Sequence, residues 1–160
     1  MTMPLATVEL MTPVDTREFG RRLAAVLRPG DLVIVDGPLG AGKTVLVQGI
    51  AVGLGVRGEV TSPTFVIARI HRADPGRVPL VHVDAYRLGG IAEVDDLDLD
   101  TNLDDAVTVV EWGEGKVEQL SDAHLLVRLR RQDDDTRTVE LVGVGGDWSG
   151  RIGQIDVGRG

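Results

Sequence analysis

The pattern of apolar and polar positions predicts alternating strands and helices in the first part of the chain. Residues Ala6 to Leu10 alternate weakly, which is typical of an edge strand. A helical pattern opens at Thr16, where apolar residues recur at a spacing of about 3.6 residues, and it stops at Pro29-Gly30. The continuous apolar run from Leu32 to Val35 predicts a strand that is buried on both faces.

The rest of the chain predicts mainly strands. Thr64 to Ile70 and Val78 to Val83 are β-rich and flank the turn signal Asp74-Pro75-Gly76, so they predict a hairpin. Three further elements are expected: a short helix in the mixed apolar and acidic stretch Ile91 to Leu99, a buried strand at Ala106 to Val110, and a C-terminal hairpin of His124 to Leu129 with Thr138 to Val142.

Intermixed helices and strands, several of them continuously apolar, predict a three-layer α/β domain with a mixed sheet and antiparallel hairpin additions. The chain has 160 residues, which fits one domain. We place that domain at residues 1–145 and expect the glycine-rich tail, residues 146–160, to be partly disordered.

Composition narrows the function classes. Cysteine is absent, which excludes disulfides and thiolate metal sites. No apolar run approaches the roughly 18 residues of a membrane span, and Met1 to Leu10 lacks the basic residues of a signal peptide, so a cytoplasmic protein is expected. The net charge is -8 without a basic patch, which argues against direct, autonomous binding of RNA or DNA.

The turn Gly37-Pro38-Leu39-Gly40-Ala41-Gly42-Lys43-Thr44 matches the phosphate-binding pattern G-x-x-x-x-G-K-[ST]. Its glycines let backbone N–H groups converge on phosphate oxygens, and a helix starting near Gly42 adds its positive dipole end. Lys43 supplies charge to the β- and γ-phosphates, and the Thr44 hydroxyl can enter a magnesium shell. The predicted nucleotide contacts are Gly37, Leu39, Gly40, Ala41, Gly42, Lys43, Thr44 and Val45.

The context of this turn supports ATP and Mg²⁺ binding over a glycine-rich turn without a ligand. An apolar strand precedes it, and an apolar-periodic helix, expected to end at Gly53 or Gly55, follows it. A strand followed by this turn and a helix is the structural setting in which such turns hold phosphates.

Two carboxylates at predicted strand ends are candidates for the magnesium site. Asp84 follows Val81 to Val83, and Glu111 follows Val107 to Val110. Either can bind magnesium directly or through water, or orient the attacking water, and the sequence leaves these roles open. His82 is interpreted as a structural histidine.

Hydroxyl and arginine side chains add further candidates for the same site. Thr64, in Thr61-Ser62-Pro63-Thr64, can contact the γ-phosphate or metal as a switch residue does, although an ordinary loop is the plainer interpretation. Arg87 and Arg137 can reach phosphate, and surface or ion-pairing roles are equally compatible with the sequence.

The later motifs give a specific resemblance. The phosphate turn is followed by Ser62-Pro63-Thr64, then by His82-Val83-Asp84-Ala85-Tyr86-Arg87-Leu88, then by Val110-Glu111-Trp112. In order and spacing, from about residue 10 to residue 143, this set resembles the TsaE (YjeE) family of bacterial ATPases required for threonylcarbamoyladenosine modification of tRNA.

The resemblance implies a P-loop NTPase-like fold, weak ATPase activity, and association with TsaB-like and TsaD-like proteins. It implies that Thr44 and Glu111 are magnesium ligands, and that Asp84 is a hydrolysis or metal-shell acid. It also implies that Thr64 is the switch-like threonine. The expected catalytic residues are therefore Lys43, from the chemistry of the phosphate turn, together with Asp84, Glu111 and Thr64. Carried over in the same way, Trp112 and, by a weaker match, Arg137 lie beside the nucleotide.

Other functions share the phosphate turn. A small-molecule kinase would need an acceptor pocket and usually an arginine-bearing lid, which the sequence does not suggest. A GTPase would usually carry Asn-Lys-x-Asp, whereas the single asparagine, Asn102, is followed by Leu103. A nucleotide-gated switch or scaffold, in which hydrolysis is incidental to partner binding, remains an alternative.

Overall fold

The computed structural model describes residues 6–37, 42–56, 68–71, 77–84, 105–111, 123–132, 136–145 and 147–155, with the backbone alone for residues 68–71 and 84. In chain order the described elements are β1 (Ala6–Leu10), α1 (Pro13–Ala24), β2 (Leu32–Asp36), α2 (Lys43–Leu54), β3 (Ala68–His71), β4 (Leu80–Asp84), β5 (Val107–Glu111), β6 (His124–Arg131), β7 (Arg137–Val144) and α4 (Trp148–Ile152).

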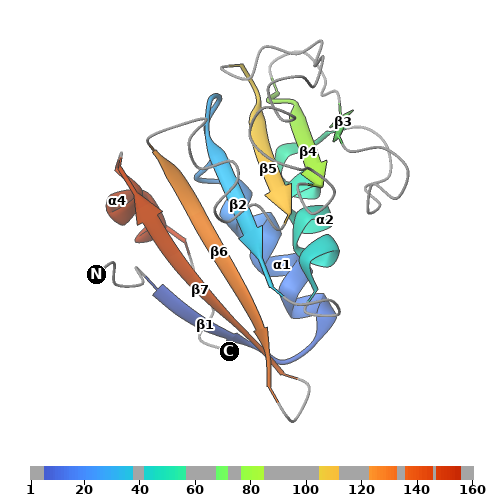
Figure 1. The fold of residues 1–160 in the computed structure, drawn as a ribbon, viewed down its shortest axis with the longest axis vertical. Coiled ribbons are helices and arrows are strands. Elements are labelled where there is room, and N and C mark those ends of the chain that lie inside the picture. Colours follow the sequence, from blue (N-terminus) through green and yellow to red (C-terminus); the bar gives the residue numbers. More distant parts are fainter. Residues whose placement is uncertain are drawn as a thin grey trace.

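The described strands form one sheet in the order β1-β7-β6-β2-β5-β4-β3 (Figure 1). The strands at its centre are parallel: β2 pairs in parallel with both β5 and β6, and β4 pairs in parallel with β5. Its two margins are antiparallel, formed by β3 with β4 and by β1, β7 and β6. This confirms the mixed sheet, the edge position of β1 and both predicted hairpins.

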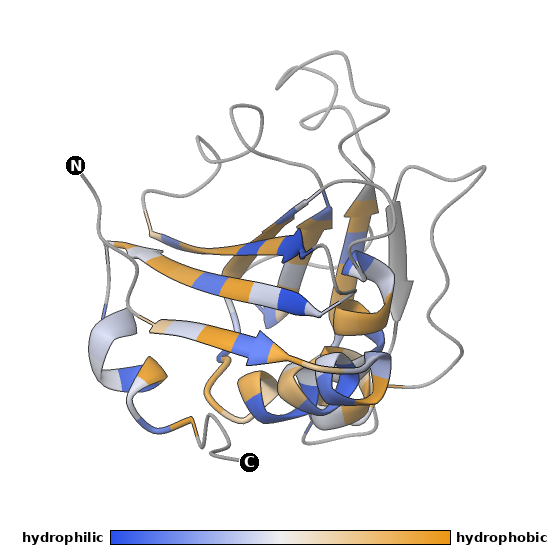
Figure 2. Ribbon diagram, turned by 90° about the horizontal axis from the view of Figure 1, so that it is seen from below, coloured by the Kyte–Doolittle hydropathy of each residue, from blue (hydrophilic) through white to orange (hydrophobic). Residues whose placement is uncertain are grey.

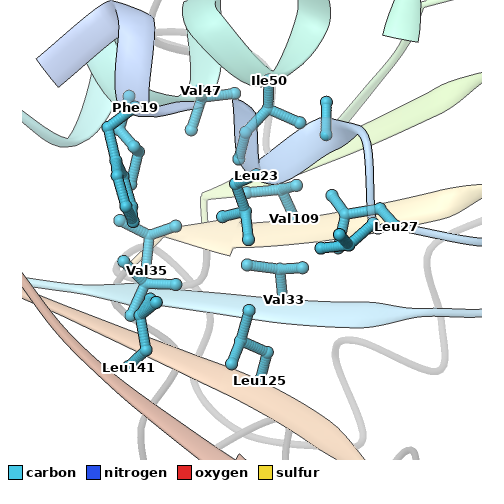
Figure 3. Packing of buried hydrophobic residues seen from close by; sticks show 14 of the residues in the cluster. Phe19, Leu23, Leu27, Val33, Val35, Val47, Ile50, Val109, Leu125 and Leu141 are labelled. Atoms are coloured by element: carbon cyan, nitrogen blue, oxygen red, sulfur yellow. The ribbon is translucent and has the colours of Figure 1, made fainter. Parts of the chain in front are cut away.

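Helices α1 and α2 lie side by side against one face of the sheet, and α4 lies on the same side (Figures 1 and 2). The core fills the space between these helices and the sheet, where Phe19 points toward Val35 and Leu23 points toward Val33 (Figure 3). The opposite face is also buried, since Ile34 has no exposed surface. The predicted short helix at residues 91–99 lies outside the described residues.

The start of α1 corrects a sequence prediction. The pattern placed the start of the helix at Thr16, whereas the helix begins at Pro13. Thr12 caps it: the Asp15 N–H donates to Thr12 Oγ1 at 3.1 Å, and the Thr12 N–H donates to the Asp15 carboxylate at 3.1 Å. This reciprocal capping box, with proline at the first helical position, satisfies N–H groups that would otherwise lack partners.

Glycines allow α1 and α2 to approach at backbone distance. A β-carbon placed on Gly49 would lie 2.0 Å from the carbonyl oxygen of Arg17, and one on Gly20 would lie 2.4 Å from that of Leu46. Such distances are far below van der Waals contact, so only glycine fits at these positions. The packing fixes α1 against α2, the helix that follows the phosphate turn.

The C-terminal segment also differs from the prediction. The expectation of a tail outside the domain does not hold for residues 147–155, because α4 packs against the core. Trp148, Ile152 and Ile155 are 3%, 4% and 7% exposed. Their spacing of four and three residues builds one apolar face, a helical signal that the surrounding glycines obscured.

Arg151 holds α4 to the rest of the domain. Its guanidinium donates to the carbonyl of Val26, just after α1, at 2.9 Å from Nε and 2.6 Å from Nη2. It also pairs with Asp31, and it stacks 4.1 Å from the centroid of the Trp148 ring. The Arg151 side chain is 7% exposed and that of Asp31 is 12% exposed, so water replaces these contacts poorly.

Arg151→Ala is therefore expected to lower the free energy of unfolding by about 2–3 kcal/mol, because a buried carboxylate and carbonyl lose their donor. Urea unfolding measures this change. Arg28→Ala is the control: its ion pair with Asp147 is exposed, and its loss should cost less than about 0.5 kcal/mol. Equal changes in the two variants would contradict the anchoring role of Arg151.

Candidate nucleotide-binding site

Three parallel strands end together at one edge of the sheet. Val35 of β2 is the register partner of Glu111 on β5, and Glu111 is also the partner of Asp84 on β4. The chain leaves β2 at Gly37 to enter the phosphate turn. Both candidate carboxylates therefore sit in the same row of the sheet as the beginning of that turn, as the sequence predicted from the strand ends.

Strand alternation decides which face Glu111 occupies. Val33, Val35 and Val109 belong to the core beneath α1 and α2, and Glu111 lies two residues after Val109. Successive side chains point to opposite faces of a strand, so Glu111 shares the face that α1 and α2 cover. Glu111 and α2, the helix that follows the phosphate turn, therefore lie on the same side of the sheet. Glu111 is 6% exposed.

The described ends of the phosphate turn have the properties that an anion site needs. Gly42 adopts φ 97° and ψ 21°, a left-handed conformation that favours glycine. Helix α2 then begins at Lys43 with no side-chain cap and no acidic residue in its first turn, which leaves its positive end open to phosphate. Lys43 Nζ donates to the carbonyl of Gly37 at 2.7 Å, so its ammonium lies across the turn.

Arg137 lies at the start of α2. A β-carbon placed on Gly42 would be 4.0 Å from Arg137 Nε and 3.7 Å from Thr16 Cγ2. Arg137 begins β7 and pairs in register with Leu10, whose side chain is in the core beneath α1. The structure thus brings Arg137 close to the end of the phosphate turn, although Arg137 lies 93 positions after Thr44 in the sequence.

In the fold, this arginine from the C-terminal hairpin is a neighbour of the turn that follows β2, despite the long stretch of sequence between them. The sequence alone left Arg137 with surface, ion-pairing and phosphate roles open. Its position beside Gly42 favours the phosphate role, because a guanidinium there adds positive charge where the α2 dipole is already positive.

The structure also gives His82 a partner that the sequence did not reveal. Its imidazole is fully buried, and its Nε2 is hydrogen-bonded to Oε2 of Glu111. The interpretation of His82 as a structural histidine did not connect it to a candidate metal ligand. The available signal was its position two residues before Asp84, on the same face of a strand that leads to the site.

Several predicted site residues lie outside the described part of the chain: Leu39, Gly40, Ala41, Thr64 and Trp112. For Asp84 the backbone alone is described, and it places the residue beside Glu111. Among the described residues no group of three or more His, Cys, Asp or Glu side chains is placed to hold a metal ion. Within the same ranges, no helix has the length and apolarity needed to cross a membrane.

Comparison with known proteins identifies the family. The model of the family described as threonylcarbamoyl adenosine biosynthesis protein TsaE matches residues 10–139. The chain belongs to the TsaE family. This confirms the resemblance that the phosphate turn and the three later motifs suggested.

Two TsaE relatives and one solved structure show how far the similarity extends. The tRNA threonylcarbamoyladenosine biosynthesis protein TsaE of Streptomyces coelicolor is 59% identical over 138 residues, covering 83% of this chain and 93% of that protein. The protein of the same name from Mycobacterium tuberculosis is 54% identical over 139 residues, covering 82% and 83%. The crystal structure of Bacillus subtilis YdiB superposes with a TM-score of 0.77 at 30% identity, covering 96% of this chain and 95% of that one.

Proposed function

We propose that this chain is the cytoplasmic ATP-binding and ATP-hydrolysing component of the machinery that makes N6-threonylcarbamoyladenosine in tRNA, and that it acts with TsaB-like and TsaD-like proteins. The observation that carries the proposal is the placement of Lys43, the open end of α2 and Glu111 at one edge of the sheet. Membership of the TsaE family supplies the pathway.

Lys43 and the start of α2 bind the phosphates in this proposal. The Lys43 ammonium, which donates to the Gly37 carbonyl, would bind the β- and γ-phosphates of ATP. The backbone N–H groups of Gly42 and the following residues supply further donors, and Arg137 adds charge beside them. These groups bind and orient the triphosphate, and they neutralise charge as it shifts during hydrolysis.

The oxygen donors near the turn fit magnesium, a hard cation that is usually bound by one or two carboxylates together with substrate phosphates. Thr44, in the first turn of α2, and Glu111 are the proposed ligands, and Asp84 is the proposed metal-shell or hydrolysis acid. When bound, magnesium would neutralise phosphate charge and align the β- and γ-oxygens. Thr64 is proposed as the switch residue and Trp112 as a neighbour of the nucleotide.

Partner binding, rather than direct tRNA binding, is the expected link to the pathway. A net charge of -8 opposes a phosphate backbone, most strongly at low salt where screening is weakest. In titrations with labelled tRNA, the protein alone should bind little, and lowering the salt should not rescue binding. A purified TsaB–TsaD-like pair should bind it, more tightly with ATP than without, because nucleotide can order a switch segment.

The same experiment has a control and a contrary outcome. The Lys43→Ala variant should bind the pair equally with and without ATP, since its phosphate site is damaged. Phosphate release measured in parallel should go to water, which separates the proposal from a small-molecule kinase. Tight binding of tRNA by the chain alone, together with no affinity for the pair, would overturn the assigned role.

A further inference from the structure

The hydrogen bond between His82 and Glu111 joins two neighbouring strands beneath the proposed magnesium site. The His82 side chain has no exposed surface, and the Glu111 side chain is 8% exposed. An ionised carboxylate can only accept hydrogen bonds, so Nε2–H is the donor to Oε2 when Glu111 carries its charge. Water is therefore largely excluded from the point at which the imidazole contacts Glu111.

The register explains how the contact is made. The partner of His82 across the β4–β5 pair is Val109, two residues before Glu111, whose own partner is Asp84. The imidazole therefore reaches diagonally toward the carboxyl edge of the sheet, on the face shared with Glu111. Since β4 and β5 are paired along their length inside the sheet, their register fixes where the donor lies relative to Glu111.

We propose that His82 is a positioning residue, which fixes the Glu111 carboxylate so that one oxygen is held by the imidazole and the other serves the cation. The inference rests on the proposed function of the site. A glutamate side chain has several rotamers, and a cation that binds it must select one of them. A donor that selects the rotamer beforehand lowers this cost, as hydrogen-bonded neighbours of metal ligands do.

The other buried histidine of the described residues lies far from the proposed site and serves as a comparison. His124, 8% exposed, begins β6 at the opposite, amino end of the strands, away from the row that holds Asp84 and Glu111. His82 instead has its Nε2 directed at a carboxylate of the site. A burial role alone would not require that contact.

Two polar substitutions at position 82 separate positioning from packing. Glutamine places an amide N–H at about the reach of Nε2, whereas asparagine is too short to reach Glu111. With the protein loaded with a non-hydrolysable ATP analogue, Mn²⁺ affinity is measured by electron paramagnetic resonance. We expect His82→Asn to weaken Mn²⁺ binding about tenfold, as loss of such supporting hydrogen bonds typically does, and His82→Gln to remain within about threefold of the unmodified protein.

A double-mutant cycle tests whether His82 acts through Glu111. Glu111→Gln should itself weaken Mn²⁺ binding, and adding His82→Asn to it should cause no further loss. The matched control is His124→Asn, which should leave Mn²⁺ affinity unchanged. Urea unfolding of every variant establishes that the measured proteins are folded.

The outcomes distinguish failure of this inference from failure of the proposed function. Wild-type affinity for Mn²⁺ in folded His82→Asn, equal losses in the Asn and Gln variants, or additive losses on the Glu111→Gln background would each overturn the positioning role. Absence of nucleotide binding by the unmodified protein would instead remove the proposed function. Nucleotide affinity in the presence of EDTA should be the same for the His82 variants and the unmodified protein.

Discussion

Lys43→Ala is expected to weaken ATP binding by about 10- to 100-fold and to abolish hydrolysis, while the fold survives. A hydrogen bond to a charged group contributes about 1.5–3 kcal/mol, which corresponds to that range of affinity. In the structure Lys43 is only partly buried, and its ammonium donates to the Gly37 carbonyl of its own turn. Its removal therefore costs the core little. Calorimetric titration with ATP measures the loss.

A second variant with the same change in charge serves as the control. Arg130 lies on β6, and its side chain is 60% exposed, with Nε 4.0 Å from the Glu140 carboxylate. Because side chains alternate along a strand, Arg130 lies on the face of the sheet that points away from α1, opposite to the face of Arg131. Arg130→Ala should bind and hydrolyse ATP normally. Normal turnover by the Lys43→Ala variant would remove the phosphate turn from the mechanism.

The parts of the fold and site that the sequence predicted are those coded by local pattern. The run Leu32 to Val35 is apolar because both faces of its strand are buried, and Gly55 ends α2 with φ 75°, as a glycine at a helix end does. The phosphate turn was also predictable, because its pattern lies within one short, continuous stretch of sequence between β2 and α2. Its neighbour Glu111 was predicted because parallel strands end at a common edge.

The parts that the sequence did not predict depend on contacts between distant residues. The hydrogen bond of His82 with Glu111 spans 29 positions, and the contacts of Arg151 with Val26 span 125. No periodicity reports such pairings, because they follow from strand order and helix docking. The start of α1 is different: Thr12-Pro13 and Asp15 form a capping signal that is visible in the sequence, whereas the apolar periodicity of the helix begins only later.

Gly49→Ala is expected to lower the free energy of unfolding by about 3 kcal/mol or more, the upper range for overpacking a core. The added methyl group would lie 2.0 Å from the Arg17 carbonyl oxygen and 2.8 Å from its carbonyl carbon. Both atoms belong to the backbone of α1, so no side-chain rotation can relieve the clash. The helices must separate, and the buried contacts of Phe19 and Leu23 with the core then loosen.

The control for this substitution is Gly150→Ala in α4, where a β-carbon would meet nothing within 4 Å. Alanine favours helix over glycine by up to about 1 kcal/mol, so Gly150→Ala should leave the protein as stable or slightly more stable. Opposite signs of the two changes in urea unfolding would locate the effect in the α1–α2 contact rather than in helix propensity.

Separation of the helices also moves Thr16 away from Gly42, which immediately precedes α2. The folded fraction of Gly49→Ala should therefore bind ATP more weakly than the unmodified protein, and unchanged stability together with unchanged ATP affinity would contradict the backbone contact.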